Sequence, residues 1–146
     1  MKTIEDPIVV EQTYYVPIAS VWKAVTDAAL MRQWYFGNIP AFEAEVGFET
    51  RFDVECADRN FPHVWKVTEV EAPHRLVYDW SYDGFEGKSF VMFELSEGDG
   101  STTLRLTHTT TEDFPDDGPE FARESCLEGW KWFIEDSLGM FLESNG

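Results

Sequence analysis

The chain has 146 residues, 43% of them hydrophobic and 16% aromatic, so it is long and apolar enough to bury one core and too apolar to stay disordered. Its 28 acidic and 11 basic residues give a formal net charge of −17, which disfavours nucleic acid and anionic membranes as partners. No apolar stretch approaches the ~18 residues of a membrane span and no signal core follows Lys2, so we expect a cytoplasmic protein with a single domain over residues 1–146.

The N-terminal part of the chain predicts a strand and then two short helices. Residues 8–15 mix β-branched and aromatic side chains without a breaker, which is typical of a strand. Apolar residues at helical spacing follow Pro17 and predict a helix with that proline in its first turn. A second short helix follows, with Thr26 or Asp27 as its cap and Gly37 just beyond its end.

Residues 41–108 change to a period of two, which is typical of strands. Clusters of Gly, Pro, Asn and Asp divide this region into five or six strands, and such short links favour an antiparallel meander. Residues 109–119 are read as an acidic loop. One face of the strands is apolar and is expected to meet a helix; it consists of Phe48, Phe52, Val54, Leu76, Tyr78, Trp80, Tyr82, Val91, Phe93, Leu95, Leu104, Leu106 and His108.

The last 25 or so residues predict a long helix, from about Pro119 to about Glu143. Gly129 inside it costs ~1 kcal/mol relative to alanine, so we expect a packing reason for it, such as close approach of the sheet or a ligand. An antiparallel sheet that wraps this helix would leave a space between the two, either filled or hollow. The apolar residues at helical spacing are Cys126, Leu127, Trp130, Phe133, Ile134, Leu138, Phe141 and Leu142.

Several motifs in this order resemble the START-like (SRPBCC) superfamily, and most closely the group named for the C-terminal domain of the activator of the Hsp90 ATPase. The motifs are residues 16–27, Trp34, residues 75–80, residues 103–108 and residues 128–130, and the resemblance extends from Val9 to Leu142. It implies the α+β helix-grip fold, in which a curved antiparallel sheet of about six or seven strands wraps a long C-terminal helix, with two short helices after the first strand.

Two positions depart from the family pattern, and both add bulk. Phe48 follows Gly47 where the family often has a second glycine, and Trp65 stands where a glycine is common. If these side chains point inward they reduce the space between sheet and helix, which argues against a large, lipid-like ligand.

We predict that a cavity between sheet and helix is lined mainly by aromatic side chains, whose rings offer contact area and whose N–H groups orient a ligand. Solid core packing is the alternative for each of these residues. The candidate cavity residues are Trp34, Phe52, Trp65, Tyr78, Trp80, Phe93, His108, Trp130 and Ile134.

His108 is the polar member of this set. Its side chain either contacts a ligand or transfers a proton, or it forms hydrogen bonds to neighbouring groups. The sequence contains no recognised catalytic motif, so no catalytic residue is predicted. The three histidines are too scattered for a local metal motif, so neither a metal nor a cofactor is predicted. Cys56 and Cys126 are expected to be free thiols.

The preferred functional hypothesis is a non-catalytic binding module that holds a small hydrophobic or aromatic molecule between the sheet and the C-terminal helix. Two alternatives follow from the resemblance. One is an enzyme of the cyclase or aromatase type with His108 as proton carrier, and the other is a chaperone-associated domain with Hsp90 as its partner. The oligomeric state is left open.

Overall fold

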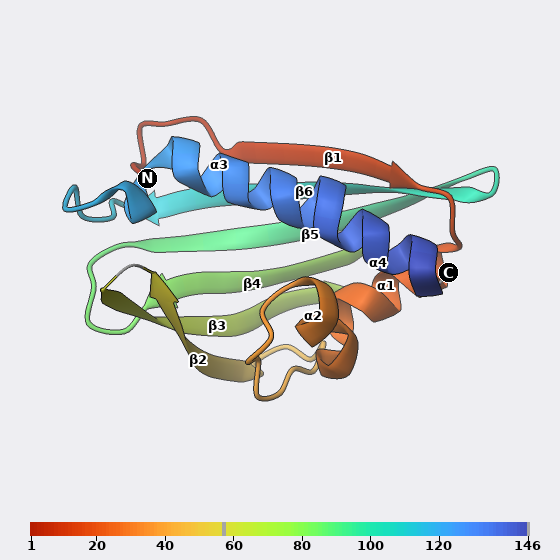
Figure 1. Ribbon diagram of the computed structural model, residues 1–146, viewed down its shortest axis with the longest axis horizontal. Helices are drawn as coiled ribbons and strands as arrows, with labels where there is room; N and C mark the ends of the chain where they lie inside the picture. The colour runs from red at the N-terminus through yellow and green to blue at the C-terminus, as the bar shows by residue number, and fades with distance from the viewer. Residues whose placement is uncertain (57, 146) are drawn as a thin grey trace.

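In the computed structural model, which describes residues 1–56 and 58–145, six antiparallel strands form a curved sheet and a long helix crosses one of its faces (Figure 1). The strand order in the sheet is β1-β6-β5-β4-β3-β2, so β1 and β2 are its two edges. The helix-grip fold is therefore confirmed. The strands are β1 (Ile8–Tyr14), β2 (Glu49–Cys56), β3 (Arg59–Glu71), β4 (Arg75–Tyr82), β5 (Lys88–Gly98) and β6 (Ser101–Glu112).

From β2 to β6 the sheet is a meander, because each strand pairs with the next one along the chain. Glycine is required at two of the connections. Gly100 has φ of +68° in the two-residue turn between β5 and β6, a conformation that other residues rarely adopt. Gly87 has φ of +107°, and a side chain there would meet Phe114 at 2.4 Å. Turns with glycine therefore form at these two connections.

Two short helices, α1 (Ile18–Thr26) and α2 (Ala28–Trp34), follow β1 as predicted. Pro17 lies just before α1, at its N-cap rather than inside its first turn. The Asp27 side chain caps α2 by accepting a hydrogen bond from the backbone N–H of Leu30 at 3.3 Å. The Thr26 hydroxyl instead donates to a backbone carbonyl within α1.

The C-terminal helix is built from three consecutive pieces: α3 (Arg123–Lys131), a π-helical segment over Trp132–Ser137, and α4 (Leu138–Asn145). A 3₁₀ turn, Pro119–Phe121, precedes it. Two hydrogen bonds hold the π segment in place. The Tyr14 hydroxyl donates to the carbonyl of Ile134 at 2.5 Å, and the Ser137 hydroxyl donates to the carbonyl of Trp34 at 2.6 Å. The π segment is therefore tied to both β1 and α2.

Three expectations from the sequence are wrong in detail. β6 continues to Glu112, where an acidic loop was expected from residue 109, because Lys88 of β5 still pairs with it there. β2 begins at Glu49, so Phe48 precedes the strand rather than lying on its apolar face. Gly129 is exposed and a Cβ there would meet nothing within 4 Å, so no close approach of sheet or ligand requires it.

Among the described residues, no helix combines the length and the apolar character that crossing a membrane requires.

Candidate functional site

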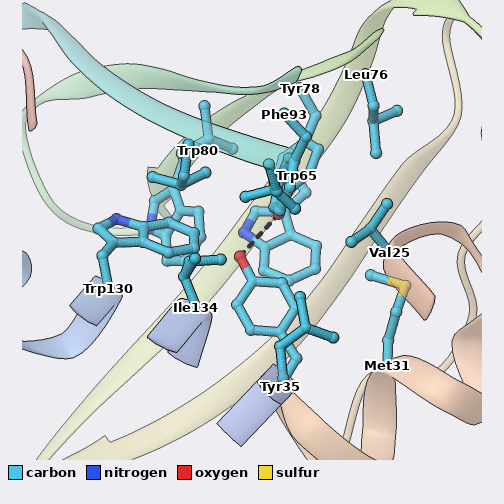
Figure 2. Close-up of a cluster of buried hydrophobic side chains, with 14 of the residues drawn as sticks. Val25, Met31, Tyr35, Trp65, Leu76, Tyr78, Trp80, Phe93, Trp130 and Ile134 are labelled. Atoms are coloured by element: carbon cyan, nitrogen blue, oxygen red, sulfur yellow. Dashed lines mark hydrogen bonds between the residues drawn. The ribbon is translucent and has the colours of Figure 1, made fainter. Parts of the chain in front are cut away.

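An aromatic core fills the region between the concave face of the sheet, the end of α2 and the C-terminal helix (Figure 2). Ring contacts run through it without a break: Trp65 lies 5.2 Å from Trp80, and Trp80 lies 5.5 Å from Trp130, measured between centroids. All nine candidate cavity residues are at most 7% exposed; they are Trp34, Phe52, Trp65, Tyr78, Trp80, Phe93, His108, Trp130 and Ile134. Trp34 is the most peripheral of the aromatic ones, since its ring contacts are with Tyr35 and Phe133.

The predicted space is filled by side chains. Trp65 is fully buried, with its ring 5.3 Å from Tyr35 and 4.8 Å from Tyr78. Phe48 is half-buried and packs on Phe42 at the margin of the core. Of the nine candidates, only His108 borders any of the hollows described, and that hollow has a volume of about 10 Å³. Ligand contact by the nine residues stays a prediction.

The candidate cavity residues omit several members of this core, among them Tyr35, Phe36 and His63, whereas Phe133 was expected among the apolar residues of the C-terminal helix. Tyr35 and Phe36 lie just after α2, where no periodicity marks the inward side chains. For His63 a signal existed, because it alternates with Phe61 and Trp65 along β3 and shares their inward face.

His108 belongs to a group of polar atoms in which every donor has an acceptor. The Trp130 indole donates to His108 Nδ1 at 2.9 Å, and His108 Nε2 lies 2.8 Å from the Ser89 hydroxyl. Since indole nitrogen only donates, Nδ1 carries no proton and Nε2 donates to Ser89, whose own hydroxyl donates to the carbonyl of Trp80 at 2.8 Å. We call Trp130, His108, Ser89 and the Trp80 carbonyl the matched cluster.

Burial keeps the histidine of the matched cluster neutral. Burial, with a smaller contribution from the charge of the N-terminal amine, lowers the pKa of His108 to about 3. His63 behaves in the same way: burial lowers its pKa to about 4, although the hydrogen bond that Nδ1 makes to the carbonyl of Phe61 opposes the change. Both rings therefore act as neutral, aromatic packing elements at neutral pH.

A second polar group lies around Trp65, and two of its three N–H and O–H protons have no acceptor among the described residues. The hydroxyls of Tyr35 and Tyr78 share a hydrogen bond of 2.8 Å, which uses one of their two protons (Figure 2). The indole N–H of Trp65 has no acceptor among the described residues. Burial raises the pKa of both tyrosines above the ordinary value, so both hydroxyls keep their protons. We call Trp65, Tyr35 and Tyr78 the donor-rich cluster.

The other core tryptophans show that this lack of an acceptor is specific to Trp65. Trp34 donates to the carbonyl of Ala24 at 2.8 Å, Trp80 donates to the hydroxyl of Tyr82 at 2.9 Å, and Trp130 donates to His108. An unmatched buried donor costs ~1–3 kcal/mol, so the position of Trp65 is energetically unusual. A hydrogen-bond acceptor from outside the chain would therefore gain more binding free energy at Trp65 than at the other core tryptophans.

The remaining polar candidates are the two cysteines and the side chains that could hold a metal ion. Cys56 is exposed, Cys126 is half-buried, and both are free thiols as predicted. Within residues 1–56 and 58–145, no group of three or more His, Cys, Asp or Glu side chains is placed to hold a metal ion.

Comparison with known proteins relates this architecture to one family and to several solved structures. The family described as Activator of Hsp90 ATPase homolog 1-like protein matches residues 15–143. DynU16, a protein from the dynemicin biosynthetic locus, is 29% identical with a TM-score of 0.76, and the match covers 97% of this chain and 48% of DynU16. CalU16 from Micromonospora echinospora is 27% identical with a TM-score of 0.67, covering 92% of this chain and 74% of CalU16.

An HSP90 activator from Plasmodium falciparum is 22% identical with a TM-score of 0.74, covering 95% of this chain and 97% of that protein, and this likeness shows the fold alone. This chain spans about half the length of DynU16. No curated protein matches the chain.

Proposed function

The chain belongs to the family of Activator of Hsp90 ATPase homolog 1-like proteins, and from that premise we propose that it is a binding module for a small, flat, neutral molecule that carries a carbonyl oxygen. The ligand lies in the aromatic core beside the donor-rich cluster. No bond is made or broken in the ligand, because binding alone uses the groups described here.

The observation that carries this proposal is the unmatched N–H of Trp65 beside the Tyr35–Tyr78 hydroxyl pair. A carbonyl oxygen has two lone pairs, so one ligand atom can accept from both the indole and the spare tyrosine proton. The surrounding rings favour a flat ligand, because stacked and edge contacts with Trp65, Tyr35 and Tyr78 supply the apolar area. The net charge of −17 argues against an anionic ligand.

Binding requires side chains to move, since the core is filled in this structure. Tyr35 and Phe36 are the ones placed to do so, because they stand on the irregular segment between α2 and β2. Phe36 is half-buried, and its ring lies 5.9 Å from Trp65 and 5.2 Å from Phe133. Rotation of Phe36 toward solvent opens the side of the core next to Trp65.

The enzyme alternative is less well supported, because it depends on a free nitrogen of His108. In the matched cluster one nitrogen accepts from Trp130 and the other donates to Ser89. A pKa lowered to about 3 also makes His108 a weak base at neutral pH.

A matched pair of ligands tests the proposal. Fluorenone and fluorene have the same flat ring system, but only fluorenone has a carbonyl. We expect fluorenone to raise the melting temperature more than fluorene, because a ligand at 100 times its Kd adds ~2.7 kcal/mol to the free energy of unfolding.

The control is Trp65→Phe, which keeps an aromatic ring and removes the N–H. In this variant the advantage of fluorenone over fluorene should be smaller, because only the spare tyrosine proton remains to donate to the carbonyl. Equal stabilisation of the unmodified chain by both compounds would contradict the proposed hydrogen bond, and no stabilisation by either would contradict binding in the core.

A further inference from the structure

A surface groove runs between the end of β1 and the second half of the C-terminal helix. Its volume is about 460 Å³; residues 12–16 form one wall, and helix residues from Glu135 to Glu143 form the other. Tyr15 and Met140, which are 84% and 59% exposed, give the groove an apolar surface. None of these residues takes part in the small-molecule binding proposed above.

The charge of the groove has one sign. Its charged lining residues are Glu135, Asp136 and Glu143, all three of them exposed carboxylates. The groove therefore combines apolar area with negative charge. A lysine or arginine side chain suits both properties, because its aliphatic stem packs on apolar surface while its charged end reaches the carboxylates.

The strand beside the groove, β1, is an edge of the sheet and contains few of the residues that usually protect an edge. Figure 1 shows β1 along the outer margin of the sheet, and an edge strand presents unpaired backbone N–H and C=O groups. Proteins commonly protect such edges with charged side chains or proline. The opposite edge, β2, has four charged residues among its eight, whereas Glu11 is the single charged residue among the seven of β1, which also lacks proline. The two edges thus differ in their readiness to accept another strand.

From the groove, its charge and the open edge together, we propose that β1 and the groove dock an extended segment of a partner protein with lysine or arginine at alternate positions. The segment adds to β1 as a further antiparallel or parallel strand, through backbone hydrogen bonds. Alternate side chains of a strand point to the same face, so the cationic ones all lie over Tyr15, Met140 and the carboxylates. A second copy of this chain is disfavoured as the occupant, because two molecules of charge −17 repel each other.

Three labelled hexapeptides test the mode of binding by fluorescence anisotropy at low salt. The first alternates Lys and Val, the second alternates Glu and Val, and the third is the first with methyl groups on its two central backbone nitrogens. We expect the Lys peptide to bind, the Glu peptide not to bind, and the methylated peptide to bind at least tenfold more weakly, because successive N–H groups of a strand point to opposite sides and one of the two lost N–H groups therefore faces β1 in either register. Equal binding of the Lys and methylated peptides would overturn the strand addition.

Removing the negative charges of the groove tests whether the Lys peptide binds there. The triple variant Glu135→Gln, Asp136→Asn, Glu143→Gln should keep the fold, as circular dichroism would check, and should bind the Lys peptide about tenfold more weakly, which corresponds to ~0.5 kcal/mol for each exposed charge.

The matched control carries the same charge change on the other sheet edge, as Glu49→Gln, Asp53→Asn and Glu55→Gln. It should change the affinity less than twofold. An equal loss of affinity in the two triple variants would show that the peptide does not bind in the groove. A dimer of the unmodified chain in sedimentation experiments without peptide would show that a second copy of the chain, rather than a cationic segment, occupies β1 and the groove.

Discussion

The two polar clusters lie in the same aromatic core, yet they differ in how their hydrogen bonds are completed. In the matched cluster, Trp130 donates a hydrogen bond to His108, His108 donates to Ser89, and Ser89 donates to the backbone carbonyl of Trp80. In the donor-rich cluster, Trp65 and one tyrosine proton have no acceptor among the described residues.

This difference separates polar groups whose hydrogen bonds are complete from polar groups that still lack an acceptor. A completed chain of hydrogen bonds in a dry core gains nothing from a ligand, because the ligand would have to replace bonds already made. An unmatched donor offers a net gain to any acceptor that reaches it. Both ring nitrogens of His108 have hydrogen-bond partners, whereas the indole N–H of Trp65 has none among the described residues.

Lowering the pH should change the free energy of unfolding more than any of the substitutions below, because the matched cluster requires neutral His108. The pKa values of His108 and His63 are lowered to about 3 and about 4, below the unfolded value of ~6.5. Between the folded and unfolded pKa values the unfolded chain binds more protons than the folded chain. The contribution of the two neutral histidines to the free energy of unfolding is therefore fully present above pH ~6.5. It falls by ~1.4 kcal/mol per pH unit for each histidine as the pH drops below that value.

Urea unfolding at pH 7, 6 and 5 measures this loss. His63→Phe keeps an aromatic ring and should remove about half of the pH dependence. Stability that does not change between pH 7 and 5 would contradict the burial of two neutral histidines.

The second largest effect is expected from removing one indole N–H from each cluster. Trp130→Phe leaves His108 Nδ1 without its donor, whereas Trp65→Phe removes a donor that had no acceptor. Both changes delete a similar ring area, so Trp130→Phe should cost about 2 kcal/mol more in urea unfolding at pH 7. Equal losses would mean that the two clusters do not differ energetically.

A smaller effect is expected from the hydroxyl pair of the donor-rich cluster. Tyr78→Phe alone leaves the Tyr35 hydroxyl without a partner and should cost ~1–2 kcal/mol, and Tyr35→Phe alone should behave alike. Because the double variant leaves no hydroxyl unmatched, it should cost less than the sum of the two single changes. Additive losses in this double-mutant cycle would contradict the direct hydrogen bond.

The smallest effect concerns Gly129, next to the tryptophan of the matched cluster. Since a Cβ there meets nothing, Gly129→Ala should stabilise the helix by ~0.5–1 kcal/mol and leave fluorenone binding unchanged. A loss of binding in this variant would place the ligand beside Trp130 instead of Trp65.

Much of the fold was predictable because local rules decide it. Alternation of apolar residues and the turn residues between them specify the meander, and the apolar spacing after Pro119 specifies the helix. The end of β6 was not predictable in this way. Thr109, Thr110, Thr111 and Glu112 carry no apolar alternation, and they are strand because β5 continues beside them.

The candidate site was predictable as a set of inward residues but not as a set of hydrogen bonds. Parity along the strands indicates that Trp65, Tyr78 and His108 share a face. The partner of each polar atom depends on groups far apart in sequence, as with Trp130 and His108. Tyr35, which completes the donor-rich cluster, lies in a segment without periodicity, so only the three-dimensional structure reveals it.

The π segment of the C-terminal helix has a geometric consequence for the core. The buried residues of that helix, Trp130, Ile134, Leu138 and Leu142, recur every four positions. In an α-helix of 3.6 residues per turn, each such step drifts by about 40°, which adds up to about 120° between the first and the last. A wider π turn removes part of this rotation and keeps the four side chains in one line over the sheet. Regular α-helical winding over the same number of residues would turn Leu138 by about 80° and Leu142 by about 120° away from the line set by Trp130, out of phase with the core.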